Sequence, residues 1–393
     1  MGFCEAEVWQ ELLLPRDLEE VEMGVKILVE NASILTMSTK EDLFIDRGYI
    51  FINNGVIESV GRGETPIDLE PPDLVINGKG KLVIPGMIAL YSRPSLLPLR
   101  GIAKRGVEEP SIYSTLTNND LYLLSTLSLA GLAMRGITTI LSTDRLVEPV
   151  VRASESVGIR VIAAPCLEDP GDLDSWAREI SSSAKKWHRR GESLALITGS
   201  ICSRRAVREG LENLVPSDMP LVVYRDACMD LKIPRILAID PPPECNIPRD
   251  SSVYTELSMD RWEPGAGYGI GANPSWSLYP HFIIARARGY SPLDILGSAT
   301  IWAAAKVSME SGVIGPGRPG DIVILDLTQP PWWVPEKILN ENLAADIAIS
   351  SIPRIEAVIV GGEIIVDDGG LLTVGMDLFS KAYNKISEIL GRI

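Results

Sequence analysis

Short runs rich in β-branched and aliphatic residues gather near both ends of the chain. They occur at 25–37, 48–61, 74–84, 320–326 and 355–369. Asn53-Asn54-Gly55 separates two strands as a hairpin turn, because Asn and Gly tolerate positive φ. The pattern therefore predicts one β-rich domain assembled from 23–84 and 312–375. The chain between these two parts is then a single inserted unit.

The inserted unit, 85–311, alternates helical patterns with short apolar strands. Helices are expected at 119–135, 149–157, 172–188, 203–214, 280–288 and 292–308. Strands are expected at 87–90, 138–142, 160–164, 194–198, 221–224, 237–240 and 268–271. The segment 241–267, rich in Pro and polar residues, is expected to be irregular. This alternation predicts an α/β fold with βα repeats and a parallel sheet or barrel.

Composition and charge restrict the partners and the compartment. The net charge of −15 argues against a nucleic acid or an anionic membrane as partner. The chain has no run of about 18 apolar residues and no leader before its first strand, so we expect a cytoplasmic protein. The five cysteines show no CxxC or zinc-ribbon spacing, which predicts neither a disulfide framework nor a structural zinc site. Only two glutamines, Gln10 and Gln329, suggest a thermophilic source.

The two extreme ends are predicted to lie outside these domains. Residues 1–22 form an acidic N-terminal extension without strand periodicity, and Met23-Gly24 opens the first strand, so Met23 is a candidate start. Residues 376–393 are expected to form a C-terminal helix.

The stretch 82–101 carries the clearest functional signal. Pro85-Gly86 turns into a buried apolar strand, after which Tyr91 and Arg93 stand two residues apart. On a continuing strand both side chains point to the same face at the carboxyl end. In a parallel barrel that end is where active sites are built.

This stretch resembles a motif of the amidohydrolase superfamily, in its chlorohydrolase and nucleoside or cytosine deaminase branch. The motif is Pro-Gly, four residues, His-x-His, and then Arg-Gly, matched here by Pro85-Gly86 and Arg100-Gly101. Further similarity lies at 136–139, 314–321, 358–362 and 370–372. The resemblance implies a TIM-like (β/α) barrel inserted in a small β-sandwich formed by both chain ends. It also implies that the barrel is trimmed near 240–267, where one βα unit is missing or degraded.

The resemblance further implies a reaction in which a zinc- or iron-activated water attacks a C–N or C–Cl carbon. The family's metal ligands follow strands one, five, six and eight, and this chain substitutes all of them. Tyr91 and Arg93 replace His-x-His, Tyr224 replaces the next histidine, and Gly271 replaces the aspartate. The segment around Asp240 provides no histidine. We therefore predict that metal-dependent catalysis is lost and that no metal cofactor is bound.

Other residues could have rebuilt a site. His188 lies at the basic end of a predicted helix, whereas His281 follows the Gly-rich strand and could reach the barrel mouth. Several thiols and carboxylates follow predicted strand ends and could hold zinc or act as a nucleophile with His281. They are Cys166, Cys202, Cys228, Asp144, Glu168, Asp226 and Asp240.

A different interpretation rests on the residues that replace the ligands. Tyr91, Arg93, Tyr224 and Arg225 would either fill the emptied site or present donors to an anionic or planar ligand. The expected pocket at the barrel mouth comprises Tyr91, Arg93, Cys202, Tyr224, Asp226, Asp240, Gly271 and His281.

Three functions follow from these alternatives. The first is a non-catalytic homologue that binds a small molecule or a protein partner. The second is a divergent hydrolase or deaminase of cyclic amides or amidines with a rebuilt Cys/Asp/His site. The third is a structural, oligomerising subunit. Trp332-Trp333 lies where the family often forms subunit contacts, so the resemblance also implies a homo-oligomer, most simply a dimer.

Overall fold

The computed structural model describes residues 25–40, 42–99, 113, 115–190, 193–230, 235–256, 259–271, 276–330, 333–350 and 354–392, without the side chains of 226, 230 and 392. The extension 1–22, Arg100-Gly101, Trp332 and the Asp226 side chain therefore lie outside the described residues.

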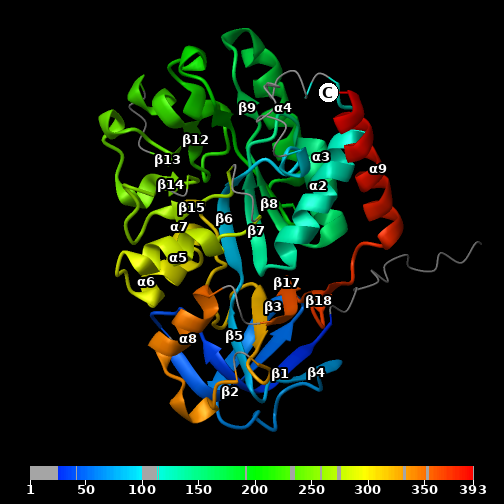
Figure 1. The fold of residues 1–393 in the computed structure, drawn as a ribbon, viewed down its shortest axis with the longest axis vertical. Helices are drawn as coiled ribbons and strands as arrows, with labels where there is room; N and C mark the ends of the chain where they lie inside the picture. The colour runs from blue at the N-terminus through cyan, green and yellow to red at the C-terminus, as the bar shows by residue number, and fades with distance from the viewer. Residues whose placement is uncertain are drawn as a thin grey trace, which may run out of the picture.

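One nine-stranded sheet draws its strands from both ends of the chain (Figure 1). The N-terminal part contributes β1 (Ile27–Leu35), β2 (Phe44–Asn53), β3 (Val56–Arg62), β4 (Leu74–Asn77) and β5 (Lys81–Pro85). The C-terminal part contributes β16 (Ile322–Asp326), β17 (Arg354–Val360), β18 (Glu363–Asp367) and β19 (Gly370–Leu371). The two parts meet where β5 pairs antiparallel with β16, in the register Val83↔Ile324. One apolar cluster takes side chains from both ends, including Ile50, Ile57 and Ile359.

The predicted hairpin turn is confirmed between β2 and β3. Asn54 and Gly55 both have positive φ, of 48° and 77°, which is the left-handed conformation that this turn needs. A Cβ on Gly55 would lie 2.6 Å from the carbonyl oxygen of Gly361, in the turn between β17 and β18. Glycine is therefore required here both for its backbone conformation and for the close approach of the two chain ends.

The inserted unit is a parallel barrel. One sheet has the order β10-β8-β7-β6 and the other the order β15-β14-β13-β12-β11-β9. The strands are β6 (Met87–Ser92), β7 (Ile137–Ser142), β8 (Arg160–Ala163), β9 (Cys166–Leu167), β10 (Ala195–Ile197), β11 (Ser200–Ile201), β12 (Leu221–Tyr224), β13 (Ile236–Ile239), β14 (Ser252–Tyr254) and β15 (Gly267–Tyr268). The barrel closes where Ile270 N donates to Tyr91 O at 2.7 Å.

The barrel has eight strand positions, because β8 with β9 and β10 with β11 are two strands that are each briefly interrupted. The expectation that one βα unit is missing or degraded near 240–267 is confirmed in part. The strand is present as β14, in a segment that the sequence pattern left irregular, but the described residues between β13 and β14 form only the 3-10 turns η7 (Pro243–Cys245) and η8 (Arg249–Ser251). Another connection between barrel strands is also shorter than expected. The helix expected at 203–214 is only two short 3-10 turns, η4 (Arg204–Ala206) and η5 (Leu211–Leu214). Gly210 between them has a φ of 81°, which a continuous helix does not allow.

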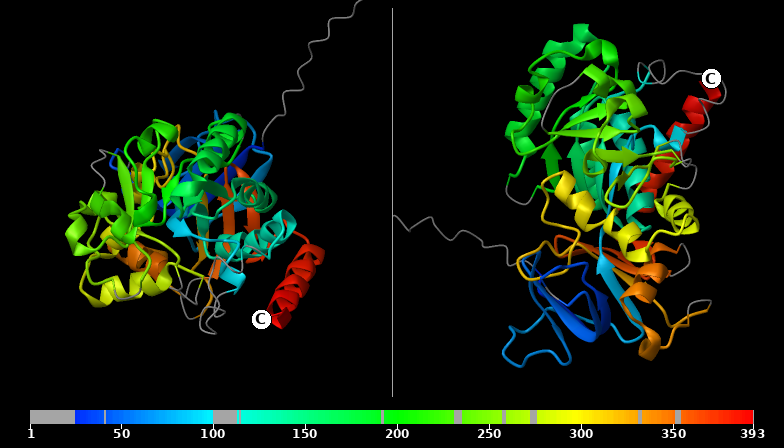
Figure 2. Two further views of the ribbon diagram at one scale, coloured as in Figure 1. Left: turned by 90° about the horizontal axis from the view of Figure 1, so that it is seen from above. Right: turned by 90° about the vertical axis from the view of Figure 1, so that its left-hand side faces the viewer.

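Helices cover the outside of the barrel and the junction with the nine-stranded sheet (Figures 1 and 2). They are α2 (Asn118–Ala133), α3 (Val147–Val157), α4 (Leu173–Trp187), α5 (Tyr279–Ala287), α6 (Pro292–Gly297), α7 (Ile301–Lys306), α8 (Glu341–Ile349) and α9 (Met376–Arg392). Thr117 and Asp120 form a capping box at the start of α2. Lys385 of α9 reaches the same carboxylate at 3.1 Å, which docks the last helix onto α2.

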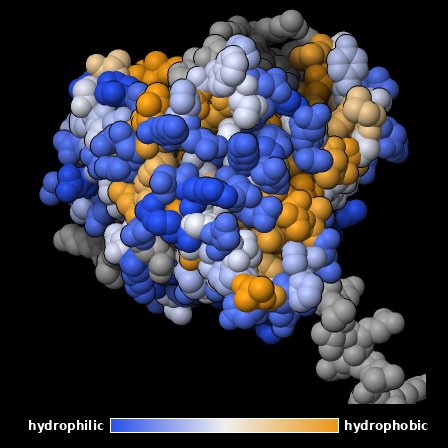
Figure 3. Space-filling view, turned by 90° about the horizontal axis from the view of Figure 1, so that it is seen from below, coloured by the Kyte–Doolittle hydropathy of each residue, from blue (hydrophilic) through white to orange (hydrophobic). Residues whose placement is uncertain are grey.

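Alternate residues of the barrel strands point inward and fill the interior. Ile88, Leu141, Val222, Leu237 and Val253 belong to one buried cluster at the barrel axis. The interior is therefore a packed core, and only the carboxyl ends of the strands are left to form a site. None of the helices in the described ranges combines the length and the apolar character that crossing a membrane requires. The face seen from below is largely hydrophilic, with small apolar areas (Figure 3).

Candidate functional site at the barrel mouth

The carboxyl ends of the barrel strands carry two groups of functional side chains. We name the first the disulfide cluster: Arg93, Thr143, Cys166, Glu168 and Cys202, which stand in or after β6, β7, β9 and β11. We name the second the tyrosine cluster: Tyr91, Tyr224, Asp240, Thr255 and His281, which stand at or after β6, β12, β13, β14 and β15. The site residues expected from the sequence are divided between the two clusters.

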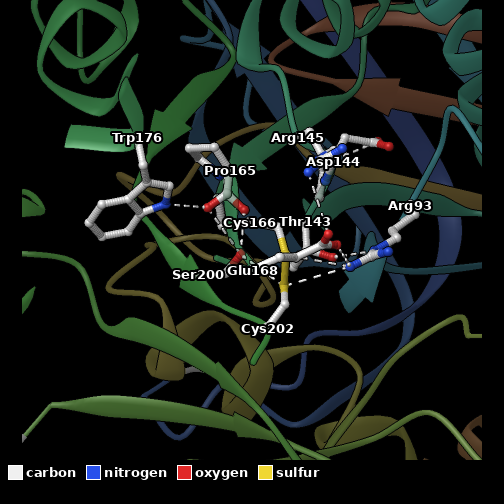
Figure 4. The surroundings of a disulfide bond; sticks show 12 residues. Arg93, Thr143, Asp144, Arg145, Pro165, Cys166, Glu168, Trp176, Ser200 and Cys202 are labelled. Atoms are coloured by element: carbon white, nitrogen blue, oxygen red, sulfur yellow. Dashed lines mark hydrogen bonds and ion pairs between the residues drawn. A yellow bond between two sulfur atoms is a disulfide. The ribbon is translucent and has the colours of Figure 1, made fainter. Parts of the chain in front are cut away.

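In the disulfide cluster, Cys166 and Cys202 are bonded to each other (Figure 4). Arg93 Nη2 lies 3.5 Å from Cys166 Sγ and 3.6 Å from Cys202 Sγ. The same nitrogen is 3.8 Å from Glu168 Oε1, and Arg93 Nε donates to Thr143 Oγ1 at 3.4 Å. A guanidinium group and a carboxylate thus meet directly over the sulfur atoms.

The expectation that the cysteines form no disulfides is wrong. A second bond joins Cys228 to Cys245, 17 residues further along the chain. Cys166 and Cys202 are 36 residues apart and meet because β9 and β11 are neighbouring parallel strands, with Cys166 opposite Ser200. The spacing of the cysteines along the chain does not show which of them are brought together when strands pair. Cys166, Cys202 and Cys228 are consequently not thiolate ligands in this structure.

Asp144 follows β7 and belongs to a buried network beside Arg93. Its carboxylate accepts hydrogen bonds from Ser95 Oγ, from Tyr113 Oη at 2.5 Å and from Ser142 Oγ at 3.0 Å. Burial raises the pKa of Asp144 above its ordinary value, although these donors oppose the shift. The carboxylate positions its neighbours and is not open to a ligand.

The centre of the tyrosine cluster is a ring stack over the packed barrel core. The Tyr91 and Tyr224 rings lie 5.6 Å apart between centroids, with an interplanar angle of 14°. Burial raises the pKa of Tyr224 to about 12, so the phenol stays protonated. The Arg225 guanidinium lies over the Tyr224 ring, 5.1 Å from its centroid. These two tyrosines stand at two of the positions where the resemblance places histidine ligands.

Thr255 connects the remaining members of the tyrosine cluster. Its backbone N–H and hydroxyl donate to the two carboxylate oxygens of Asp240, at 2.8 and 2.5 Å. Its carbonyl oxygen is 3.3 Å from His281 Nε2. A Cβ on Gly271 would lie 2.9 Å from Thr255 Oγ1, so the backbone here is close to the threonine. Sequence reasoning missed Thr255 because it follows the strand in the segment expected to be irregular.

His281 is fully buried rather than open to the mouth. Burial lowers its pKa to about 4, so the imidazole is neutral at pH 7 and Nε2–H donates to Thr255 O. Its Nδ1 is a buried acceptor with no hydrogen-bond partner among the described residues. His188, by contrast, lies at the C-terminal end of α4. It contacts Asp218 through Nε2 at 3.1 Å and accepts Ile197 N–H through Nδ1 at 3.0 Å.

A hollow of about 580 Å³ opens beside the tyrosine cluster. Its walls combine apolar side chains with charges of both signs. The lining residues are Arg225, Met229, Asp240, Pro241, Pro242, Tyr254, Glu256, Met259, Asp260 and Arg261. Burial raises the pKa of Asp240 above its ordinary value, while the Thr255 donors oppose the shift. The hollow is of a size that small-molecule sites commonly have.

The residues present do not fit the metal that the resemblance implies. Among the described residues, no three His, Cys, Asp or Glu side chains are grouped so that they could hold a metal ion. The Arg93 guanidinium, itself a cation, lies where a ligand pair is expected, and the Tyr91–Tyr224 stack occupies the adjoining space. We therefore derive no reaction step through a metal.

Comparison with known proteins identifies the lineage. No protein-family model matches the chain. The chain is 22% identical over 437 residues to the 5-methylthioadenosine/S-adenosylhomocysteine deaminase of Halothermothrix orenii, covering 94% of this chain and 100% of that protein. The deaminase of the same name from Pyrococcus furiosus is 30% identical over 156 residues, which are 37% of this chain and 35% of that protein.

Solved structures agree in fold. An adenosine deaminase from Xanthomonas campestris with bound zinc has a TM-score of 0.75 at 15% identity, covering 93% of this chain and 98% of that one. A triazine hydrolase variant has a TM-score of 0.73 at 15% identity, covering 92% and 99%. The fold is the TIM barrel of amidohydrolases. With the sequence relatives, it places this chain in the amidohydrolase superfamily, in the branch of deaminases and triazine hydrolases, and the resemblance seen in the sequence is confirmed.

Proposed function

We propose that this protein uses the deaminase scaffold to bind a purine nucleoside, or a closely similar planar ligand, without hydrolysing it. The observation that carries the proposal is the replacement of ligand positions by Arg93 and by the Tyr91–Tyr224 stack, beside a hollow of about 580 Å³. Hydrolysis in this superfamily needs a metal that activates water, and three or four protein ligands must hold it. The described residues provide no such group.

The walls of the hollow suit a planar ligand with several hydrogen-bonding groups. Tyr254 offers an aromatic surface, and Met229 and Met259 are flexible apolar contacts. Each Asp240 oxygen accepts one hydrogen bond from Thr255 and keeps capacity for another. The Asp240 carboxylate can therefore accept donors from a ribose or an exocyclic amine. Relatives named 5-methylthioadenosine/S-adenosylhomocysteine deaminase make a purine nucleoside the first ligand to test.

The second candidate is an active, divergent deaminase, which the names of the relatives favour. The rebuilt site that the sequence suggested depends on free Cys166, Cys202 and Cys228, and all three are in disulfides. The buried, neutral His281 has its Nε2 engaged by Thr255 O. These contacts support the binding function over hydrolysis.

The test is a titration of the full chain with 5′-methylthioadenosine by calorimetry, paired with an assay for released ammonia after incubation with zinc or iron. We expect saturable binding and no ammonia above the protein-free blank. Asp240→Asn should weaken binding about tenfold, because a charged acceptor in the wall is lost. Glu263→Gln, in an exposed pair with Arg249 outside the hollow, should leave affinity unchanged.

Each result decides between the three functions. Ammonia release that depends on added metal would overturn the proposal in favour of a divergent deaminase. Absence of binding by 5′-methylthioadenosine and adenosine would favour the structural subunit. The expected cytoplasmic location and homo-oligomeric state stay predictions beside this proposal.

A further inference from the structure

We propose that the Cys166–Cys202 disulfide is a redox-active site, which exchanges with small-molecule thiols at the barrel mouth. The proposal concerns the disulfide cluster and does not depend on what binds in the hollow beside the tyrosine cluster. It rests on where the bond lies, on the charged groups that touch it, and on a second disulfide in the same chain that lacks this setting.

The bond lies at the barrel mouth, where Cys166 opens β9 and Cys202 follows β11, at the third and fourth strand positions of the barrel. Cys166 is 9% exposed and Cys202 is half-buried, so Cys202 is the more exposed residue of the pair and the one that we expect an attacking thiol to reach. Figure 4 shows Arg93 and Glu168 converging on the sulfur atoms from one side, with Trp176 on the other. The Trp176 indole N–H donates to Pro165 O at 2.8 Å, which holds the backbone directly before Cys166. This hydrogen bond helps to hold Cys166 in place beside Cys202.

The Arg93 guanidinium gives the bond its chemical character. It lies 3.5 and 3.6 Å from the two sulfurs, and its side chain is only 13% exposed. Reduction converts a neutral disulfide into thiols that ionise, and a nearby cation stabilises a thiolate. Glu168 Oε1 lies 3.7 Å from Cys166 Sγ and opposes a thiolate there, but this carboxylate is paired with both Arg93 and Arg145. Arg93 contacts both sulfurs, so it favours the reduced form and makes Cys166 a better leaving group. A site with these properties is more oxidising than a disulfide in neutral surroundings.

Cys228–Cys245 provides the comparison within the same molecule. Its two sulfurs lie 2.8 and 3.9 Å from the carbonyl oxygen of Arg225. A carbonyl oxygen carries partial negative charge and disfavours a thiolate beside it, which is the opposite of what Arg93 does. The same chain thus holds one disulfide that is stabilised in its oxidised form and one that is prepared for exchange.

The exchange balances as follows. A thiolate RS⁻ attacks Cys202 Sγ, forms the mixed disulfide RS–S–Cys202 and breaks the bond to Cys166, whose sulfur leaves as a thiolate beside Arg93. A second RS⁻ attacks the RS sulfur of the mixed disulfide and releases RSSR and the Cys202 thiolate. Two small thiols are oxidised to one disulfide, two electrons reduce the protein disulfide, and the cysteine thiolates take protons from solvent. The reverse reaction consumes RSSR.

The experiment equilibrates the full chain in glutathione buffers of graded reduced-to-oxidised ratio, followed by differential alkylation and peptide mass spectrometry of the four cysteines in the two disulfides. We expect the equilibrium constant for reducing Cys166–Cys202 to exceed that of Cys228–Cys245 by at least about tenfold. Arg93→Met should lower the equilibrium constant for reducing Cys166–Cys202 about tenfold. Arg93→Lys should keep most of the original value, because the positive charge matters more than the forked shape of the guanidinium group.

The control is Arg145→Met, which removes a guanidinium paired with Glu168 Oε2 at 3.5 Å. It should change the constant less than twofold. Equal constants for the two disulfides in the unmodified chain would overturn the proposal and make both bonds structural. An Arg93→Met variant with an unchanged constant would overturn it as well. If Arg93→Met does not fold, the comparison of the two disulfides and the Arg93→Lys variant still decide.

Discussion

At the scale of single residues, aromatic and charged side chains pack against one another at the carboxyl ends of the barrel strands. Tyr91 and Tyr224 stack on each other over the barrel core, and Arg93 turns to the sulfurs of Cys166 and Cys202. Each of these side chains has partners on neighbouring strands, so the positions that they occupy are packed. Thr255 does the same for Asp240 and His281.

His281 should make stability depend on pH. Its pKa is lowered to about 4 by burial, whereas an unfolded chain has the ordinary value of about 6.5. Below pH 6.5 the unfolded state therefore takes up the proton first, so this stability is complete above pH 6.5 and is lost as pH falls towards 4. Between pH 7 and 4.5 the loss from this group is about 2.4 kcal/mol.

Urea unfolding at pH 7 and pH 4.5 measures this loss. His281→Phe and His281→Gln both lack the titration, and the glutamine keeps a donor for Thr255 O. Both variants should lose about 2.4 kcal/mol less than the unmodified chain between the two pH values. A pH dependence that is identical in all three proteins would show that His281 is not the group responsible.

At the scale of elements, interruptions and buried pairs position the site. Two residues separate β8 from β9, and two residues separate β10 from β11. Pairing of β9 with β11 after these interruptions brings Cys166 within bonding distance of Cys202. Below the barrel, Asp321 accepts Arg160 Nε at 2.7 Å, Arg160 Nη2 at 3.0 Å and Gly361 N at 2.8 Å. This carboxylate joins β8 of the barrel to the start of β16 and to the turn between β17 and β18 in the nine-stranded sheet.

Asp321→Ala should destabilise the protein by about 3–5 kcal/mol. The Asp321 side chain is 1% exposed, and removing it leaves the largely buried Arg160 guanidinium without its charge partner. Asp368→Ala is the matched control, because Asp368 is 83% exposed in its pair with Arg354. It should change the free energy of unfolding by no more than about 0.5 kcal/mol. Similar losses in the two variants, measured by denaturant titration, would contradict the role given to Asp321.

At the scale of the whole molecule, the barrel is complete in strands but reduced in helices. The crossovers through η4 and η5, and those around β13 and β14, have no α-helix in their described residues. Both disulfides lie among these shortened crossovers, Cys202 after β11 and Cys228 after β12. Intracellular disulfides occur in hyperthermophiles, so the bonds are compatible with the cytoplasmic and thermophilic predictions that the sequence suggested.

Removing the Cys228–Cys245 bond tests whether it compensates for the missing helices. The double change Cys228→Ser and Cys245→Ser should lower the free energy of unfolding by about 3 kcal/mol, since the bond closes a 17-residue loop in the unfolded chain. Guanidinium titration without reductant gives the value directly. A change smaller than about 1 kcal/mol would mean that the bond does not stabilise the fold in this way.

The sequence by itself determined the β-rich ends, the inserted α/β unit and the family. Local signals carry this information: the Asn54-Gly55 turn, the helix periods and the Pro85-Gly86 frame depend only on neighbours in the chain. The tertiary structure alone decided the disulfides, strand β14, the role of Thr255 and the burial of His281. Each of these depends on which strands become neighbours and on what is packed between them, and residues far apart in the chain leave no local pattern for such contacts.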